Sequence, residues 1–124
     1  MEEIKIVDNY MDDREFRNYV HTMFYKNGFK YLRLDDSRVS DEYPENDNDI
    51  KVTKDGKRYD VQTYLNTKIG DKEIEETEKD MIKEKLSYGI IVTNFHVGKA
   101  VREKALEKNI IILDRKVFED EVYI

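Results

Sequence analysis

The four residues Lys-Asp-Gly-Lys at positions 54–57 separate two runs rich in β-branched and aromatic residues, at positions 50–53 and 58–65. Asp and Gly readily adopt the positive φ angles that a tight hairpin turn requires. Because so short a turn fixes which residues face each other, the two runs are expected to pair as antiparallel neighbours in one register. The chain is therefore predicted to contain a sheet built around this hairpin.

Two segments have an apolar stripe along one side of a helix, which is typical of an amphipathic helix packed on one side of a sheet; in the first the spacing is i, i+3, i+4, i+7, i+8. The first, at positions 13–27, has a capping box formed by Asp12 and Glu15 and ends before Gly28. The second, at positions 71–86, has many Glu and Lys residues outside its apolar stripe, so its remaining surface should face water. The stripes are Phe16, Tyr19, Val20, Met23 and Phe24 in the first helix, and Ile74, Thr77, Met81, Ile82 and Leu86 in the second.

The other elements follow from short apolar runs and from a third helical stretch at positions 97–106. Strands are predicted at positions 4–7, 29–34, 88–92 and 110–113, with a polar loop at 35–48. The succession of strand, helix and strand near the C-terminus indicates a parallel βαβ crossover. The order of elements predicts an α/β fold of three layers, in which a central mixed sheet holds the hairpin and the βαβ unit and helices cover both faces.

The composition narrows the class of protein. A chain of 124 residues is near the commonest size of one domain, and we expect a single domain over positions 1–124. The absence of cysteine excludes disulfide scaffolds and thiolate metal sites. No apolar run is long enough to span a bilayer, and the N-terminus resembles no signal peptide, so we expect a cytoplasmic location without membrane contact.

The charge balance argues mildly against nucleic acid, because a net charge of −6 repels phosphate unless basic residues gather on one face. The best candidate for such a face is the C-terminal third, where Lys99 and Arg102 would be the nucleic-acid-binding residues. Nearby glutamates dilute this basic surface, and a solvated helix is the alternative. The basic residues that would form this face are Lys99, Arg102, Lys104, Lys108, Arg115 and Lys116.

The hairpin region, NDNDIKVTKDGKRYDVQTYLN at positions 46–66, resembles the core motif of Mrr-type restriction endonucleases in the PD-(D/E)XK superfamily. That motif has an Asp opening one strand, a Gly turn, and Gln-x-Lys on the next strand. The helix ending in KNGF, the strand GIIVTN and the segment IIILDRKVF resemble the same family, so the likeness covers nearly the whole chain. The resemblance implies a restriction endonuclease-like fold.

In that family the Asp, a carboxylate or Gln on the neighbouring strand, and often a Glu from the first helix hold a divalent metal, usually Mg²⁺. The metal activates water for phosphodiester hydrolysis, and the lysine orients or deprotonates that water. On this sequence the resemblance assigns the metal positions to Asp49 and Gln62. Strand alternation puts Gln62 on the same face as Asp60 and Tyr64.

The sequence departs from the family at two positions. Tyr64 stands where the family has its lysine, and a phenol, which titrates at about 10, supplies no positive charge at neutral pH. The helix glutamate falls on Arg17, with Glu15 offset by two residues. Lysines close in sequence that could replace the missing one are Lys57, Lys68 and Lys72.

Three functions stay open. The first is a catalytically impaired nuclease-like domain that binds DNA or a protein partner in a restriction, phage or plasmid system. The second is an active Mg²⁺-dependent DNA endonuclease with a relocated lysine, in which a backbone carbonyl beside Gln62 completes the metal shell. The third is an acidic protein-interaction module that uses the carboxylate-rich positions 35–49. A homodimer is compatible with each, and His21 and His96 are expected to be structural or surface residues.

Overall fold

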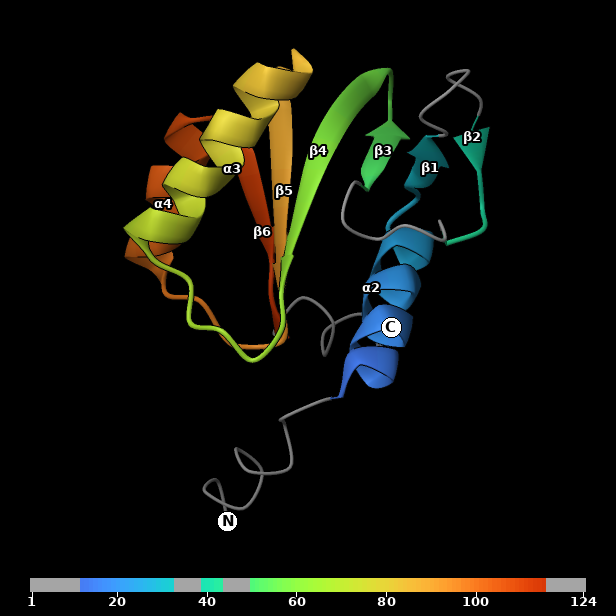
Figure 1. Cartoon of the computed structure of the whole chain (residues 1–124), viewed down its shortest axis with the longest axis horizontal. Coiled ribbons are helices and arrows are strands. Elements are labelled where there is room, and N and C mark those ends of the chain that lie inside the picture. The colour runs from blue at the N-terminus through green and yellow to red at the C-terminus, as the bar shows by residue number, and fades with distance from the viewer. Residues whose placement is uncertain (1–11, 33–38, 44–49, 116–124) are drawn as a thin grey trace.

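The computed structural model describes residues 12–32, 39–43 and 50–115, and helices and strands follow one another largely as the sequence predicts (Figure 1). The strand predicted at positions 4–7 lies outside these residues. The helices are α2 (Asp13–Lys26), α3 (Asp71–Glu84) and α4 (Lys99–Glu107). The strands are β1 (Lys30–Leu32), β2 (Val39–Ser40), β3 (Lys51–Lys54), β4 (Lys57–Tyr64), β5 (Tyr88–Thr93) and β6 (Ile110–Leu113).

The described strands form a six-stranded mixed sheet in the order β2-β1-β3-β4-β5-β6. Strands β2, β1, β3 and β4 pair antiparallel, whereas β4, β5 and β6 are parallel and are connected through α3 and α4. Helix α2 covers one face of the sheet, and α3 and α4 cover the other (Figure 1). The predicted three-layer α/β fold, with its hairpin and its βαβ unit, is therefore confirmed.

The β3–β4 turn has the conformation that its sequence favours. Asp55 and Gly56 have φ angles of 54° and 78°, so both central residues are left-handed, as a type I′ hairpin turn requires. The hydroxyl of Thr53 donates to the carbonyl of Lys57 at 2.8 Å, and this hydrogen bond across the turn stabilises it. The resulting register places Lys51 opposite Asp60.

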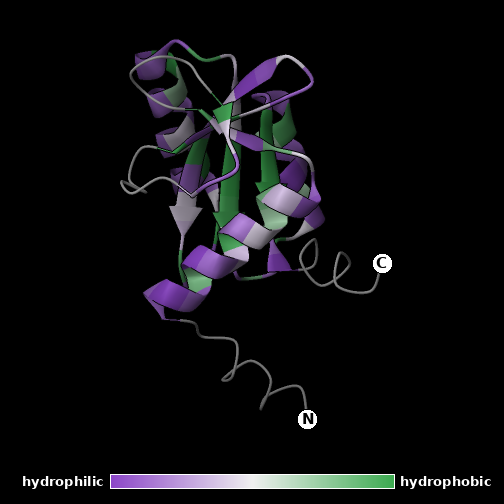
Figure 2. Cartoon of the chain, turned by 90° about the vertical axis from the view of Figure 1, so that its right-hand side faces the viewer, coloured by the Kyte–Doolittle hydropathy of each residue, from purple (hydrophilic) through white to green (hydrophobic). Residues whose placement is uncertain are grey.

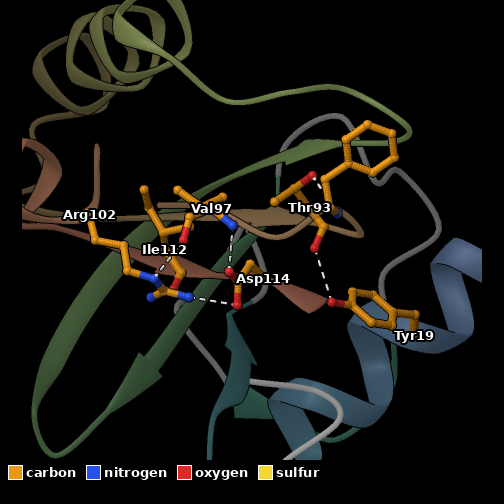
Figure 3. Close-up of polar contacts among 7 residues, drawn as sticks. Tyr19, Thr93, Val97, Arg102, Ile112 and Asp114 are labelled. Atoms are coloured by element: carbon orange, nitrogen blue, oxygen red, sulfur yellow. Dashed lines mark hydrogen bonds and ion pairs between the residues drawn. The ribbon is translucent and has the colours of Figure 1, made fainter. Parts of the chain in front are cut away.

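Helix α2 begins at the predicted capping box, in which the Asp12 side chain accepts from the Glu15 N–H at 2.8 Å and the Glu15 side chain accepts from the Asp12 N–H at 3.2 Å. All five residues of its apolar stripe are buried. They pack against residues of β1, β3, β4 and β5 in one core cluster. The Tyr19 hydroxyl also donates to the carbonyl of Thr93 at 3.0 Å, which fixes the helix to the end of β5 (Figure 3).

A second core cluster lies between the sheet and helices α3 and α4, and includes Ile74, Met81, Ile91 and Ala105. Figure 2 shows that the central strands consist largely of hydrophobic residues, while the helices contain many hydrophilic residues. Gly89 on β5 lets α3 approach closely, because an added Cβ would lie 2.7 Å from the sulfur of Met81.

Three details differ from the sequence prediction. Ile82, expected in the α3 stripe, is 72% exposed because it lies about 100° around the helix from Met81. Helix α3 ends at Glu84, since Lys85 adopts a left-handed φ of 60°. Strand β2 lies within the predicted loop, and its two residues are too few to give an alternating pattern. In the described residues no helix has the length and apolar character needed to cross a membrane.

Candidate functional site

The two predicted site residues on β4, Gln62 and Tyr64, both point towards helix α3. The Gln62 amide donates to the carboxylates of Asp80 at 2.9 Å and Asp60 at 3.1 Å. The Tyr64 hydroxyl donates to Glu76 at 2.9 Å. Asp60, Gln62 and Tyr64 therefore share one face of the sheet, as strand alternation predicts.

Helix α3 meets these residues with carboxylates spaced four positions apart, Glu76, Asp80 and Glu84, which we call the acidic row. Residues at this spacing lie on one side of a helix. Glu76 contacts Tyr64 and Asp80 contacts Gln62, while Glu84 forms a 3.3 Å ion pair with Lys51 of β3. Each carboxylate of the acidic row thus has a polar partner on the sheet.

Asp60 is a buried carboxyl group at the centre of this contact, with 1% of its surface exposed. Burial, together with hydrogen bonding to Asp80, raises the pKa of Asp60 to about 7, and Gln62 and Lys51 offset only part of that rise. Asp60 therefore holds a proton below about pH 7, because burial disfavours its ionised form and the nearby Asp80 carboxylate adds repulsion.

Tyr64, at the position of the family lysine, is held as a neutral phenol. Its pKa lies well above the usual range, first because of burial and second because its hydroxyl donates to Glu76. A neutral hydroxyl facing a carboxylate gives this position no positive charge to offer a phosphate.

Asp49, the other predicted metal ligand, lies outside the described residues, as does most of the acidic run at positions 35–49. Mg²⁺ prefers about six oxygen ligands, whereas Gln62 presents its amide nitrogen to Asp60 and Asp80. Within residues 12–32, 39–43 and 50–115 no group of three or more His, Cys, Asp or Glu residues could hold a metal ion. The acidic cluster around Gln62 therefore does not fit a magnesium shell without further ligands.

Arg17, at the position of the family's helix glutamate, lies on the other side of the sheet from Gln62. It belongs to α2, and its guanidinium lies 4.7 Å from the centroid of the Tyr43 ring. The positions that the resemblance groups into one site are thus divided between the α2 face and the α3 face.

The two residues predicted to bind nucleic acid have different surroundings. Lys99 is exposed at the start of α4. The Arg102 guanidinium forms a 2.6 Å ion pair with buried Asp114 and donates to the carbonyl of Ile112 at 3.0 Å, and Asp114 also accepts from the Val97 N–H at 2.7 Å (Figure 3). Arg102 therefore fastens α4 to the end of β6.

Sequence reasoning missed Lys51, Asp80 and Asp114. A signal for Lys51 was present, because the hairpin register places it opposite Asp60. The four-residue spacing of the acidic row was a signal for Asp80. Asp114 directly follows the apolar strand β6, and a buried carboxylate at such a place needs a cationic partner.

Comparison with known proteins agrees with the fold. No curated protein and no solved structure matched the chain. A family model of restriction endonucleases, of the Mrr catalytic type, matches residues 8–121. Because this match covers far more than half of the sequence, the chain belongs to the Mrr-type restriction endonuclease family.

Proposed function

We propose that this restriction endonuclease-like domain binds DNA and is impaired in phosphodiester hydrolysis. The observation that carries the impairment is the hydrogen bond from Tyr64 to Glu76 at the position of the family lysine. The membership in a restriction endonuclease family supports DNA binding. A lysine there would place an ammonium group beside the scissile phosphate, where charge develops during hydrolysis. The neutral phenol supplies no such charge, and the neighbouring carboxylate repels phosphate.

The contacts of Gln62 support the same proposal. Its amide nitrogen bridges Asp60 and Asp80, so the side chain joins β4 to α3. These two hydrogen bonds fix the orientation of the Gln62 amide. Turning its oxygen towards a cation would remove the N–H donor from both Asp60 and Asp80. The position therefore serves the packing of α3 on the sheet.

An active Mg²⁺-dependent DNA endonuclease is the second candidate, and Lys51 is the observation that favours it. Restriction endonucleases usually use Mg²⁺. The Lys51 side chain is only 11% exposed, lies opposite Asp60 and is close enough to lower the pKa of that carboxyl group. By contrast, Lys57 lies over the Tyr88 ring, and Lys68 and Lys72 are exposed. Lys51 is thus the best-placed substitute for the missing lysine.

The test combines cleavage with binding. Wild type, Asp49→Ala, Tyr64→Lys and Lys51→Gln are incubated with plasmid and with single-stranded DNA, each with Mg²⁺ or Mn²⁺. Binding of a labelled duplex is followed by fluorescence anisotropy at fixed salt, since phosphate contacts depend steeply on ionic strength.

We expect wild type to bind DNA without cutting it. If wild type cleaves DNA and Asp49→Ala does not, the proposal of impaired hydrolysis is wrong. If Lys51→Gln also fails to cleave, the second candidate, an active endonuclease that uses Lys51, is established. If wild type does not bind the labelled duplex, the proposal of DNA binding is rejected. A protein partner would then be the remaining candidate ligand.

A further inference from the structure

A cavity of about 570 Å³ opens on the α2 face of the sheet. Its floor includes Thr63 and Leu65 of β4, which alternate with Gln62 and Tyr64 and therefore point to the opposite side of the sheet. The first turns of α2 form one wall, and Tyr43 forms another. The cavity is thus separate from the cluster around Gln62, and its volume lies in the range of about 300–1,000 Å³ that small-molecule sites occupy.

Two arginines give this cavity a positive wall although the whole chain carries a net charge of −6. Arg14 and Arg17 are three residues apart on α2 and so lie on the same side of the helix. Arg14 is exposed and makes no hydrogen bond or ion pair with any other residue that the structure describes. Paired guanidinium groups match the oxygens of a phosphate, which they bind through parallel hydrogen bonds.

The remaining walls suit a flat ring. Phe16 and Leu65 line the cavity with apolar side chains, although Phe16 is only 7% exposed. Tyr43 is held between neighbours, because its ring centroid lies 5.5 Å from that of Tyr31 and 4.7 Å from the Arg17 guanidinium. A fixed aromatic wall of this kind favours a planar, partly apolar group.

Asp13 adds one acceptor to the same cavity. A bare phosphate would be repelled by this carboxylate, whereas a larger ligand can place a hydroxyl or amino donor against it. The lining therefore favours a ligand with three parts: an anionic group, a planar ring and a hydrogen-bond donor.

We infer that this cavity binds one nucleotide unit, with its phosphate on Arg14 and Arg17 and its base against Phe16, Tyr43 and Leu65. The inference deepens the proposed function and rests on it in one respect, since the nucleotide belongs to a bound DNA strand if the domain binds DNA. A free mononucleotide offers the same chemistry, and the experiment separates the two sources.

The probes are a fluorescein-labelled single-stranded oligodeoxyadenylate, AMP, adenosine and inorganic phosphate, with binding followed by anisotropy and competition. The variants are Arg14→Gln and Arg17→Gln, with Arg17→Lys as the conservative replacement. Lys26→Gln is the matched control, because it removes one exposed positive charge from the far end of the same helix. Circular dichroism melts check folding, and Arg14→Gln changes an exposed side chain with no described partner to lose.

Each glutamine variant is expected to weaken oligonucleotide and AMP binding by about tenfold or more, as loss of a charge-assisted hydrogen bond does. Lys26→Gln should stay within about twofold of wild type, and adenosine and phosphate should each bind more weakly than AMP. Equal weakening by Lys26→Gln, or undiminished binding in both arginine variants, overturns the inference while leaving DNA binding by the domain intact. Binding of AMP that depends on Arg14, without binding of any DNA, supports the cavity and rejects the proposed function.

Discussion

The amide nitrogen of Gln62 donates a 2.9 Å hydrogen bond to the carboxylate of Asp80, and so joins the central strand β4 to helix α3. The same helix meets Tyr64 through Glu76 and Lys51 through Glu84. The strand that carries the Gln-x-Lys motif in related nucleases here contacts two carboxylates of α3, Glu76 and Asp80, and the neighbouring strand β3 contacts the third, Glu84. The acidic row therefore makes this face of β4 a packing surface for α3.

The raised pKa of Asp60 predicts how stability changes with pH. The pKa is about 7 in the folded protein and about 3.9 in an unfolded chain, so between these values the folded state binds more protons. The contribution of this group to stability is therefore complete below pH 4 and is lost as the pH rises through 7. Asp60→Asn keeps the shape of the protonated form and should gain roughly 1–3 kcal/mol over wild type at pH 8.

Urea denaturation at several values between pH 5 and pH 8 measures this effect. Asp55→Asn is the matched control, because Asp55 lies exposed in the hairpin turn, where Asn-Gly is equally favourable. A constant difference between Asp60→Asn and wild type over this range would contradict the prediction.

The ion pair between Arg102 and Asp114 predicts a large loss of stability on truncation. Asp114 has a side chain that is 1% exposed, so Arg102→Met removes a cation that pairs with a buried carboxylate and should cost about 3–5 kcal/mol. The exposed pair of Lys104 and Asp71 is the control, and Lys104→Met should cost less than about 1 kcal/mol. Equal midpoints of urea denaturation for the two variants would refute the assignment.

The close approach of α3 to Gly89 predicts a steric effect. In Gly89→Ala the new methyl group would lie 2.7 Å from the Met81 sulfur and 3.1 Å from a methyl carbon of Thr77, so the variant should lose about 1–3 kcal/mol. Met81→Ala removes the nearer atom, and the double variant should lose less than the sum of the two single losses. Additive losses in a double-mutant cycle would show that the two positions do not touch.

The contact between Tyr64 and Glu76 predicts that restoring the lysine alone gives little cleavage. In Tyr64→Lys the ammonium group would face the carboxylate that now accepts from the tyrosine hydroxyl, and the two charges would pair. Adding Glu76→Gln releases the ammonium, so plasmid nicking with Mg²⁺ should be faster in the double variant than in Tyr64→Lys. Equal rates in the two variants would mean that Glu76 does not restrain this position.

The parts of the fold that were predictable are those that nearby residues determine. The Asp55-Gly56 turn required positive φ angles, and the Asp12 capping box marked the start of α2. The two-residue strand β2 was missed, because its pairing with β1 depends on contacts that leave no periodic pattern in the sequence. The prediction that Ile82 belongs to the buried stripe of α3 was wrong, because the predicted stripe covered too large an angle around the helix.

The candidate site was predictable only in part, for a related reason. Alternation along β4 gave the shared face of Gln62 and Tyr64, but it could not identify the helix that covers this face. Nor could it show that Arg102, chosen as a basic surface residue, turns its guanidinium towards Asp114. Contacts between residues that are distant in the sequence are set by the tertiary structure, so the pattern of a single segment does not predict them.

The hydrogen bond from Tyr19 to the carbonyl of Thr93 joins residues 74 positions apart in the chain. Strands β4, β5 and β6 are connected through single helices, so their pairing closes shorter loops and can nucleate earlier during folding. Docking of α2 on β5 closes a longer loop, and the cavity between α2 and β4 is complete only once α2 has docked. A ligand held there would bind the completed protein in preference to a partly folded chain, and would slow degradation by shifting that equilibrium.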